Sequence, residues 1–141
     1  DYQFFLPAMR RFKQQPNNWF GSVTPADMRK AMTMVRRDGP ITVRDIDDDV
    51  LVEKHHPWAS RKPSKRALQL AFYCGDVTIA ARHGMLRSYD LPARHFGWTR
   101  KPKAASEAEI NRYVLERGLR AQGVVSLDSL CHLDAGRKPK L

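Results

Sequence analysis

A predicted helix over residues 64–74 carries side chains that could bind a polyanion. Its buried stripe would consist of Ala67, Leu68, Ala71 and Phe72. Its polar side chains would lie mostly on the other side: Lys65, Arg66, Gln69 and Tyr73. Lysine and arginine at a helix start can contact phosphates or guanine edges, glutamine can pair with adenine, and we expect the tyrosine to contact the DNA backbone. A merely solvated polar face explains the same pattern equally well.

A predicted β-hairpin directly after this helix shifts the balance toward DNA. A strand over residues 77–81 runs into a tight turn at His83 and Gly84, and residues 85–89 return, because glycine readily adopts the positive φ of such a turn. Three side chains would lie at or near the tip, within reach of the phosphate backbone or minor groove: Arg82, His83 and Arg87. Arg61 and Lys62, just before the helix, would extend this basic surface.

The elements that position these residues can be predicted from helix-capping signals. Residues 2–12 have helical spacing, and a clearer helix begins after Thr24, with Pro25 in its first position and Asp27 as the capping-box acid. This helix ends at Gly39, and Thr42 with Asp45 caps a short helix that runs to about residue 46. Residues 50–62 are predicted to form an exposed connector. The order of helix, short helix, helix and hairpin predicts a mainly helical α+β fold, a winged helix-turn-helix domain.

The chain also contains a weak internal repeat. A helix begins at Ser106, whose partner Glu109 completes a capping box, and ends at Gly123. Residues 36–46 and 120–130 share arginine, glycine, an aliphatic residue, a hydroxyl cap and two further aliphatic residues at one offset, 123 − 39 = 84. This likeness predicts the opening of a second, tandem winged-helix unit that is truncated, although common helix punctuation could also produce it. The predicted segments are an N-terminal helix and connector (1–23), the winged-helix domain (24–91), a basic linker (92–105) and the opening of the second unit (106–141).

The composition favours a negatively charged partner. The 25 Lys and Arg residues against 15 Asp and Glu give a formal net charge of +10 and a pI near 10.1. Nucleic acid is the first choice of partner and an anionic membrane surface the second; a solvated surface or basic tail is the alternative. The two cysteines do not suggest a disulfide scaffold, so a reducing cytoplasm is expected. No apolar run reaches the roughly 20 residues of a membrane span, and the start of the chain lacks a signal-peptide layout and an initiator Met, as expected of an excised fragment.

The common catalytic and metal-binding motifs are missing. The histidines and cysteines show no C-x-x-C or H-E-x-x-H spacing, and no phosphate-binding, serine-hydrolase or dinucleotide motif occurs. We therefore predict no catalytic residue, no metal site and no cofactor in this chain.

Several phrases together resemble the YcaQ-like family of winged-helix crosslink-repair DNA glycosylases. They lie at residues 37–45, 65–68, 75–77 and 82–91, and the most specific are Gly-Pro-Ile-Thr at 39–42 and Arg-Ser-Tyr-Asp-Leu at 87–91. The resemblance implies a bacterial DNA-repair protein that excises alkylated or crosslinked bases without a metal cofactor. The catalytic Gln-apolar-Gln/Asp signature of that family lies N-terminal to the matching region, and Gln69-Leu70 is followed here by Ala71.

The resemblance and the fold lead to one main hypothesis and two alternatives. The main hypothesis is a segment that grips double-stranded DNA while the remainder of its parent chain hydrolyses the glycosidic bond. Such a protein would be cytoplasmic and nucleoid-associated when bound to DNA. A sequence-specific transcriptional regulator and a protein-interaction module are the alternatives, since winged helices serve many functions.

Overall fold

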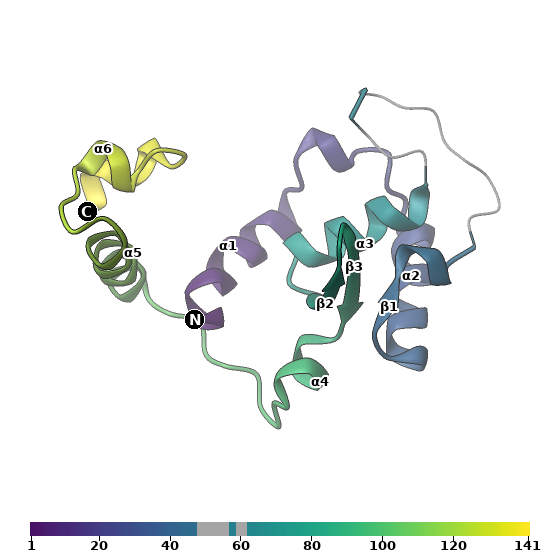
Figure 1. Cartoon of the computed structure of the whole chain (residues 1–141). Helices are drawn as coiled ribbons and strands as arrows, with labels where there is room; N and C mark the ends of the chain where they lie inside the picture. Colours follow the sequence, from purple (N-terminus) through teal and green to yellow (C-terminus); the bar gives the residue numbers. More distant parts are fainter. Residues whose placement is uncertain (48–56, 59–61) are drawn as a thin grey trace. The chain divides into compact units, whose positions relative to one another are not determined.

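The computed structural model describes residues 1–47, 57–58 and 62–141 (Figure 1). The predicted connector at 50–62 therefore lies largely outside the described residues. The chain divides into two compact units. Residues Asp1–Pro7 and Pro102–Leu141 form the smaller unit, and Ala8–Lys101 form the larger one. Among the described residues, no helix is long and apolar enough to cross a membrane.

Helix α2 (Pro25–Asp38) belongs to the larger unit, and its predicted start is confirmed. The Thr24 side chain accepts a hydrogen bond from the Asp27 backbone N–H, and the Asp27 carboxylate accepts one from the Thr24 backbone N–H. These two bonds satisfy amide groups that a helix start otherwise leaves without partners. The helix ends at Gly39, whose φ of 81° suits a residue without a Cβ.

A strand that the capping signals did not predict follows this helix. Ile41–Thr42 form β1, and the predicted short helix is the single 3-10 turn η2 (Val43–Asp45). Thr42 and Asp45 do form the predicted capping box. β1 pairs antiparallel with β3 (Leu86–Asp90), which pairs antiparallel with β2 (Thr78–His83), so the sheet has the order β1-β3-β2.

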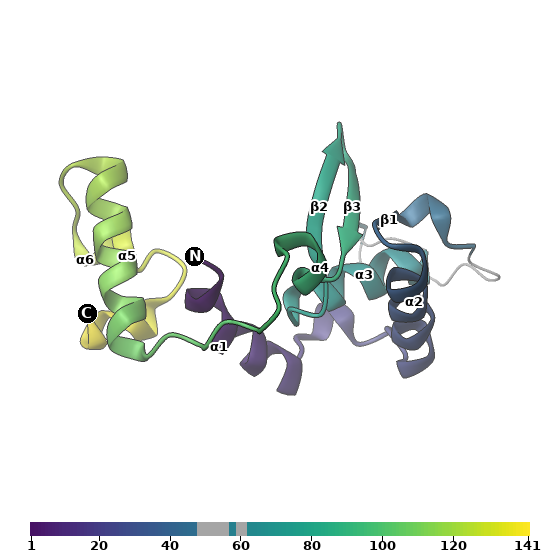
Figure 2. The same ribbon diagram turned by 90° about the horizontal axis from the view of Figure 1, so that it is seen from below.

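The hairpin turn lies one residue later than predicted. His83 pairs with Leu86, so the two turn residues are Gly84 and Met85. Gly84 has a φ of 59°, and glycine at the first turn position is typical of two-residue hairpin turns. Figure 2 shows β2 and β3 projecting from the helices as a wing.

The core of the larger unit lies between α2, α3 (Pro63–Tyr73) and the sheet. Its buried residues are Ala31, Met32, Val35, Ile41, Ile46, Ala67, Leu68, Ala71, Val77 and Tyr89. They come from α2, β1, α3 and β3 and from positions next to η2 and β2, and burying them together fixes α3 against the sheet. The fold is α+β, mainly helical and winged-helix-like, as the sequence predicts.

A short helix, α4 (Pro92–Phe96), occupies the start of the segment predicted as a basic linker. Its Arg94 donates hydrogen bonds to the backbone carbonyls of Val35 and Arg36 and forms an ion pair with the buried Asp90 carboxylate at 3.2 Å. These bonds satisfy carbonyls at the C-terminal end of α2. The start of the segment is therefore helical and bonded to α2 rather than a free linker.

Residues N-terminal to α2 cover a second side of α3. Helix α1 (Tyr2–Gln14) contributes Phe12, and η1 (Asn18–Phe20) contributes Phe20; their rings lie 6.0 Å apart between centroids. Both rings contact Tyr73 of α3, at 5.4 and 5.7 Å. The Lys13 ammonium pairs with Asp76 at 2.7 Å, just beyond the end of α3.

The smaller unit contains α5 (Glu107–Gln122), α6 (Leu127–Leu130) and η3 (Ala135–Lys140). The predicted Ser106–Glu109 capping box is present. Gly123 ends α5 with a φ of 76°, and Ser126 caps α6, just as Gly39 ends α2 and Thr42 caps η2. In both repeated stretches, a glycine thus ends one helix and a hydroxyl side chain caps the next.

Candidate nucleic-acid interface

A cleft in the larger unit lies between α3, η2 and the wing. Its volume is about 360 Å³. It is lined by Val43, Arg44, Lys65, Gln69, Met85, Leu86, Arg87 and Tyr89. Lys65 and Gln69 are one turn apart on α3, so their side chains share a helix face, and Arg87 lies opposite on β3. The structure therefore brings together three of the residues that the sequence singles out.

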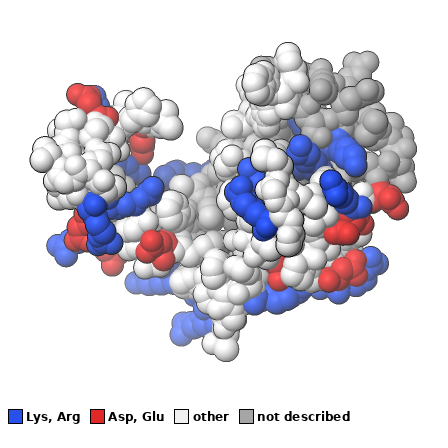
Figure 3. All heavy atoms as spheres, in the orientation of Figure 1, with Lys and Arg blue, Asp and Glu red and all other residues white. Residues whose placement is uncertain are grey.

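The charge in this cleft is of one sign. Arg44, Lys65 and Arg87 line it, and none of its lining residues is acidic. Within the described parts of the chain, none of these three cations forms an ion pair or a side-chain hydrogen bond. Lys and Arg side chains gather around the wing on the face seen in Figure 3. Uncompensated cations beside a cleft attract an anion and raise its local concentration.

The wing carries two further predicted residues. Arg82 pairs with Arg87 across the hairpin, which places two guanidinium groups on one face of the ribbon. Like charges placed opposite each other destabilise a strand pair unless an anion lies between them. His83 is exposed at the end of β2, and Met85 at the tip is 97% exposed. The tip thus presents a basic surface to solvent.

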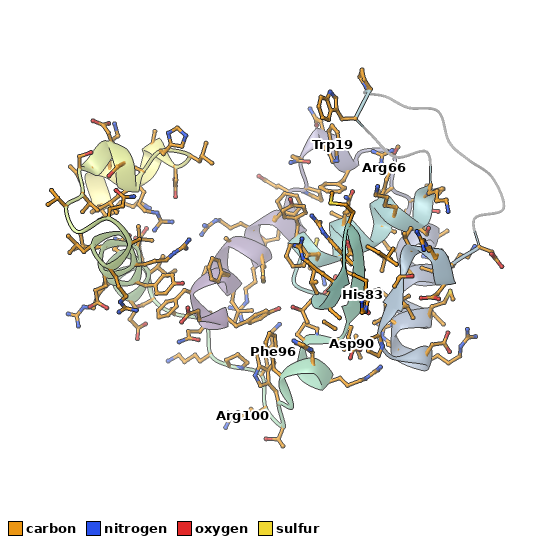
Figure 4. The ribbon with its side chains drawn as sticks, in the orientation of Figure 1. Trp19, Arg66, His83, Asp90, Phe96 and Arg100 are labelled. Atoms are coloured by element: carbon orange, nitrogen blue, oxygen red, sulfur yellow. The ribbon has the colours of Figure 1, made fainter. Side chains whose placement is uncertain are left out.

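Arg66 does not lie on this surface, contrary to the sequence prediction. Its side chain is only 2% exposed, and its guanidinium donates to the Ser22 hydroxyl and, at 2.5 Å, to the Trp19 carbonyl oxygen (Figure 4). Its Nε has no hydrogen-bond partner, and burial lowers the pKa of the guanidinium. Arg66 holds η1 and its following turn against α3, and it cannot reach a ligand in the cleft.

Tyr73 likewise lies outside the cleft, because its ring packs against Phe12 and Phe20. Lys62 is exposed immediately before α3, next to the basic surface. Arg61, the remaining predicted residue, lies outside the described residues. Among the residues that are described, no group of three or more His, Cys, Asp and Glu side chains could hold a metal ion.

Arg44 is the cleft residue that the sequence predictions missed. Thr42 and Asp45 identified this stretch as a helix cap, and the arginine between them received no role. Its position is nevertheless determined by the cap, since the Arg44 backbone N–H donates to the Thr42 hydroxyl at 3.2 Å. A cation inside a capping box that precedes a helix with a basic polar face is the signal that could have found it.

Comparison with known families shows which family the chain belongs to. Residues 1–138 match the family described as DNA glycosylase AlkZ-like. The chain belongs to this family. The match covers both units, agrees with the resemblance seen in the sequence, and assigns the chain to DNA repair with DNA as the implied partner. No curated protein and no solved structure matches this AlkZ-like chain.

Proposed function

We propose that the larger unit binds double-stranded DNA through the cleft between α3, η2 and the wing, in a glycosylase that acts on alkylated or crosslinked bases. One observation carries the proposal: Arg44, Lys65 and Arg87, which form no ion pair with any described residue, line a cleft whose lining includes no carboxylate, in a chain of the AlkZ-like family. Neutralising phosphates with Lys and Arg releases counterions, and this supplies most of the affinity of a DNA-binding surface.

The arrangement of the cleft suggests a division of roles. Lys65 near the start of α3 and Gln69 one turn later would enter the major groove, where glutamine can pair with adenine. Arg44 and Arg87 flank them and would hold phosphates on either side. Arg82 and His83 on the wing would follow the backbone or reach into the minor groove.

The proposed role of this segment is to hold DNA, and the glycosidic bond would be hydrolysed elsewhere in the protein. The Gln-apolar-Gln/Asp signature implied by the family resemblance has no match among the cleft residues, since Gln69 and Leu70 are followed by Ala71. A glycosylase must take its target base out of the stack. A tight grip on the flanking phosphates would support that step.

Fluorescence anisotropy with a labelled duplex tests the proposal. The combined variant Arg44→Ala, Lys65→Ala, Arg87→Ala is compared with wild type and with a control that removes the same charge elsewhere in the larger unit. The control variant is Arg10→Ala, Arg29→Ala, Arg36→Ala, three exposed arginines that form no ion pair in the described part of the chain. We expect the cleft variant to lose at least about tenfold in affinity and the control to lose far less. Equal losses in the two variants would leave only a general effect of net charge and contradict the proposed surface.

A further inference from the structure

Met85 lies at the apex of the wing with almost no protein around it. It is 97% exposed, the highest value among the large hydrophobic residues that the structure describes as exposed. A side chain that stays in water adds nothing to the hydrophobic stabilisation of the fold. Its neighbour in the turn, Gly84, has no side chain, and a Cβ there would meet nothing within 4 Å. The apex is therefore a single apolar side chain on a slender turn.

The flanks of this apex are basic. Arg82 and Arg87 pair across the hairpin, and His83 lies between Arg82 and the turn. Residues 77–89 contain no Asp or Glu. Within the described ranges of the chain, the two arginines form no ion pair. An apolar tip between such cations is complementary to a groove of DNA, where phosphates line the edges and base pairs form the floor.

The base of the wing is fixed in the core of the larger unit. Tyr89 of β3 is buried and pairs with Ile41 of β1 on one side and Ile79 of β2 on the other. The next residue, Asp90, is also buried, and its carboxylate forms the ion pair with Arg94 that joins β3 to α4. The ribbon is thus anchored at one end, while its apex projects away from the helices (Figure 2).

We propose that Met85 inserts between two base pairs from the minor groove and kinks the DNA there, with Arg82 and Arg87 on the flanking phosphates. The inference rests on the proposed function, because the α3 cleft must hold the duplex for the wing to reach an adjacent groove. Proteins that insert an apolar side chain into a base step unstack it and kink the duplex by roughly 20–90°. A glycosylase gains from such a kink, because a base in an unstacked step is easier to take out of the helix.

Resonance energy transfer across an end-labelled duplex tests the wedge. A kink of about 60° at the centre of a duplex of about 20 base pairs shortens its end-to-end distance from about 68 Å to about 59 Å. Saturating wild-type chain should therefore raise the transfer efficiency about 1.5-fold, for a dye pair whose Förster distance lies between these two values. Met85→Ala keeps every cation, so it should bind within about threefold of wild-type affinity and leave the efficiency at that of the free duplex.

A duplex with one central mismatch gives a second readout. Unstacking costs less at a mismatched base pair, so wild type should bind this duplex at least about fivefold more tightly than the fully paired one. Met85→Ala does not unstack a step and should bind both duplexes alike.

Two control variants separate the wedge from a general loss of apolar surface. Met85→Leu keeps an apolar side chain that can insert and should retain the kink and the preference for the mismatch. Leu133→Ala removes a similarly exposed side chain, 93% exposed, from the smaller unit and should leave both unchanged. Straight DNA in the wild-type complex would overturn the wedge. A wild-type kink or mismatch preference in Met85→Ala, or loss of the kink in either control, would overturn it too.

The outcomes also separate the wedge from the proposed function. Wild-type affinity in the combined variant Arg44→Ala, Lys65→Ala, Arg87→Ala contradicts the α3 cleft. Wild-type chain that binds the duplex with the expected salt dependence but leaves it straight contradicts the wedge alone. Wild-type chain that binds no duplex contradicts both.

Discussion

Two residues on one face of α3 should respond differently to salt. Lys65 and Gln69 line the same cleft and lie one helical turn apart, but only the lysine carries a charge. If Lys65 neutralises one phosphate, Lys65→Ala should reduce the slope of log affinity against log salt by about 0.9. Gln69→Ala should leave that slope unchanged, because a contact to a base edge releases no counterion.

The size of the effect is large enough to measure. Over a fourfold rise in salt, from about 50 mM to about 200 mM, one phosphate contact accounts for a change of about 3.5-fold in affinity. The ratio of wild-type to Lys65→Ala affinity should therefore shrink by that factor across the series. With all three cleft cations removed, the corresponding factor is about 40-fold.

Anisotropy titrations on duplexes of two different sequences make the comparison complete. Lys65→Ala should weaken binding to both sequences alike, whereas Gln69→Ala should change the preference between them by roughly 1–3 kcal/mol where an adenine is contacted. An unchanged salt slope in Lys65→Ala, or a reduced slope in Gln69→Ala, would refute the assignment of these side chains to phosphate and base.

Three further changes test the structure around the cleft. Arg66→Ala removes two hydrogen bonds and leaves space beside η1. Urea unfolding should therefore show a loss of roughly 2–4 kcal/mol in the free energy of unfolding, while the duplex affinity of the folded protein is unchanged. Unchanged stability would contradict the buried role of this arginine. In Gly84→Ala the new Cβ meets no atom within 4 Å, so any loss of stability comes from the positive φ of this residue. Thermal unfolding should show a loss of roughly 1–2 kcal/mol in the free energy of unfolding. No loss of stability would contradict the turn conformation described above. Ser106→Ala removes the hydroxyl hydrogen bond that is the largest cause of the lowered pKa of Glu109, while the bond from the backbone N–H of residue 106 stays. That stabilisation is present at neutral pH and lost as pH falls through the lowered pKa, and an NMR titration of the Glu109 carboxyl should show its pKa raised in the variant.

Helix starts could be predicted from the sequence because their signals are local. Thr24 and Ser106 each bond to a residue three positions on, and the structure contains both capping boxes. The wing was also predictable, since alternating strands around a glycine define a hairpin without help from distant residues. The turn was predicted one residue too early. Gly84 can be either the first or the second residue of a two-residue turn, so the sequence pattern does not decide between His83 and Met85 as its partner.

Elements of two to five residues could not be predicted in the same way. β1 consists of Ile41 and Thr42 and exists because β3 pairs with it. Thr42 pairs with Ser88 and Ile41 with Tyr89, which are 46 and 48 residues further along the chain. Helix α4 depends on Arg94 reaching the end of α2. Such partners come together only in the folded chain.

The error at Arg66 has a clear physical origin. A periodic stripe assumes that a helix is buried on one side, whereas α3 is covered by the core on one side and by Phe12, Trp19 and Phe20 on another. The second covering buries Arg66 and engages Tyr73, and only Lys65 and Gln69 remain facing the cleft. Charge alone does not distinguish an arginine that binds a ligand from one that donates to backbone carbonyls.

The most direct test of DNA binding by the α3 cleft is amide NMR of the isotope-labelled chain titrated with a short duplex. Signals of Arg44, Lys65, Gln69 and the wing residues 82–87 should shift together and saturate at one duplex concentration. Signals of α2 at Arg29 and Arg36, outside the cleft, should stay in place. Shifts confined to other surfaces, with the α3 and wing signals unmoved, would contradict the account.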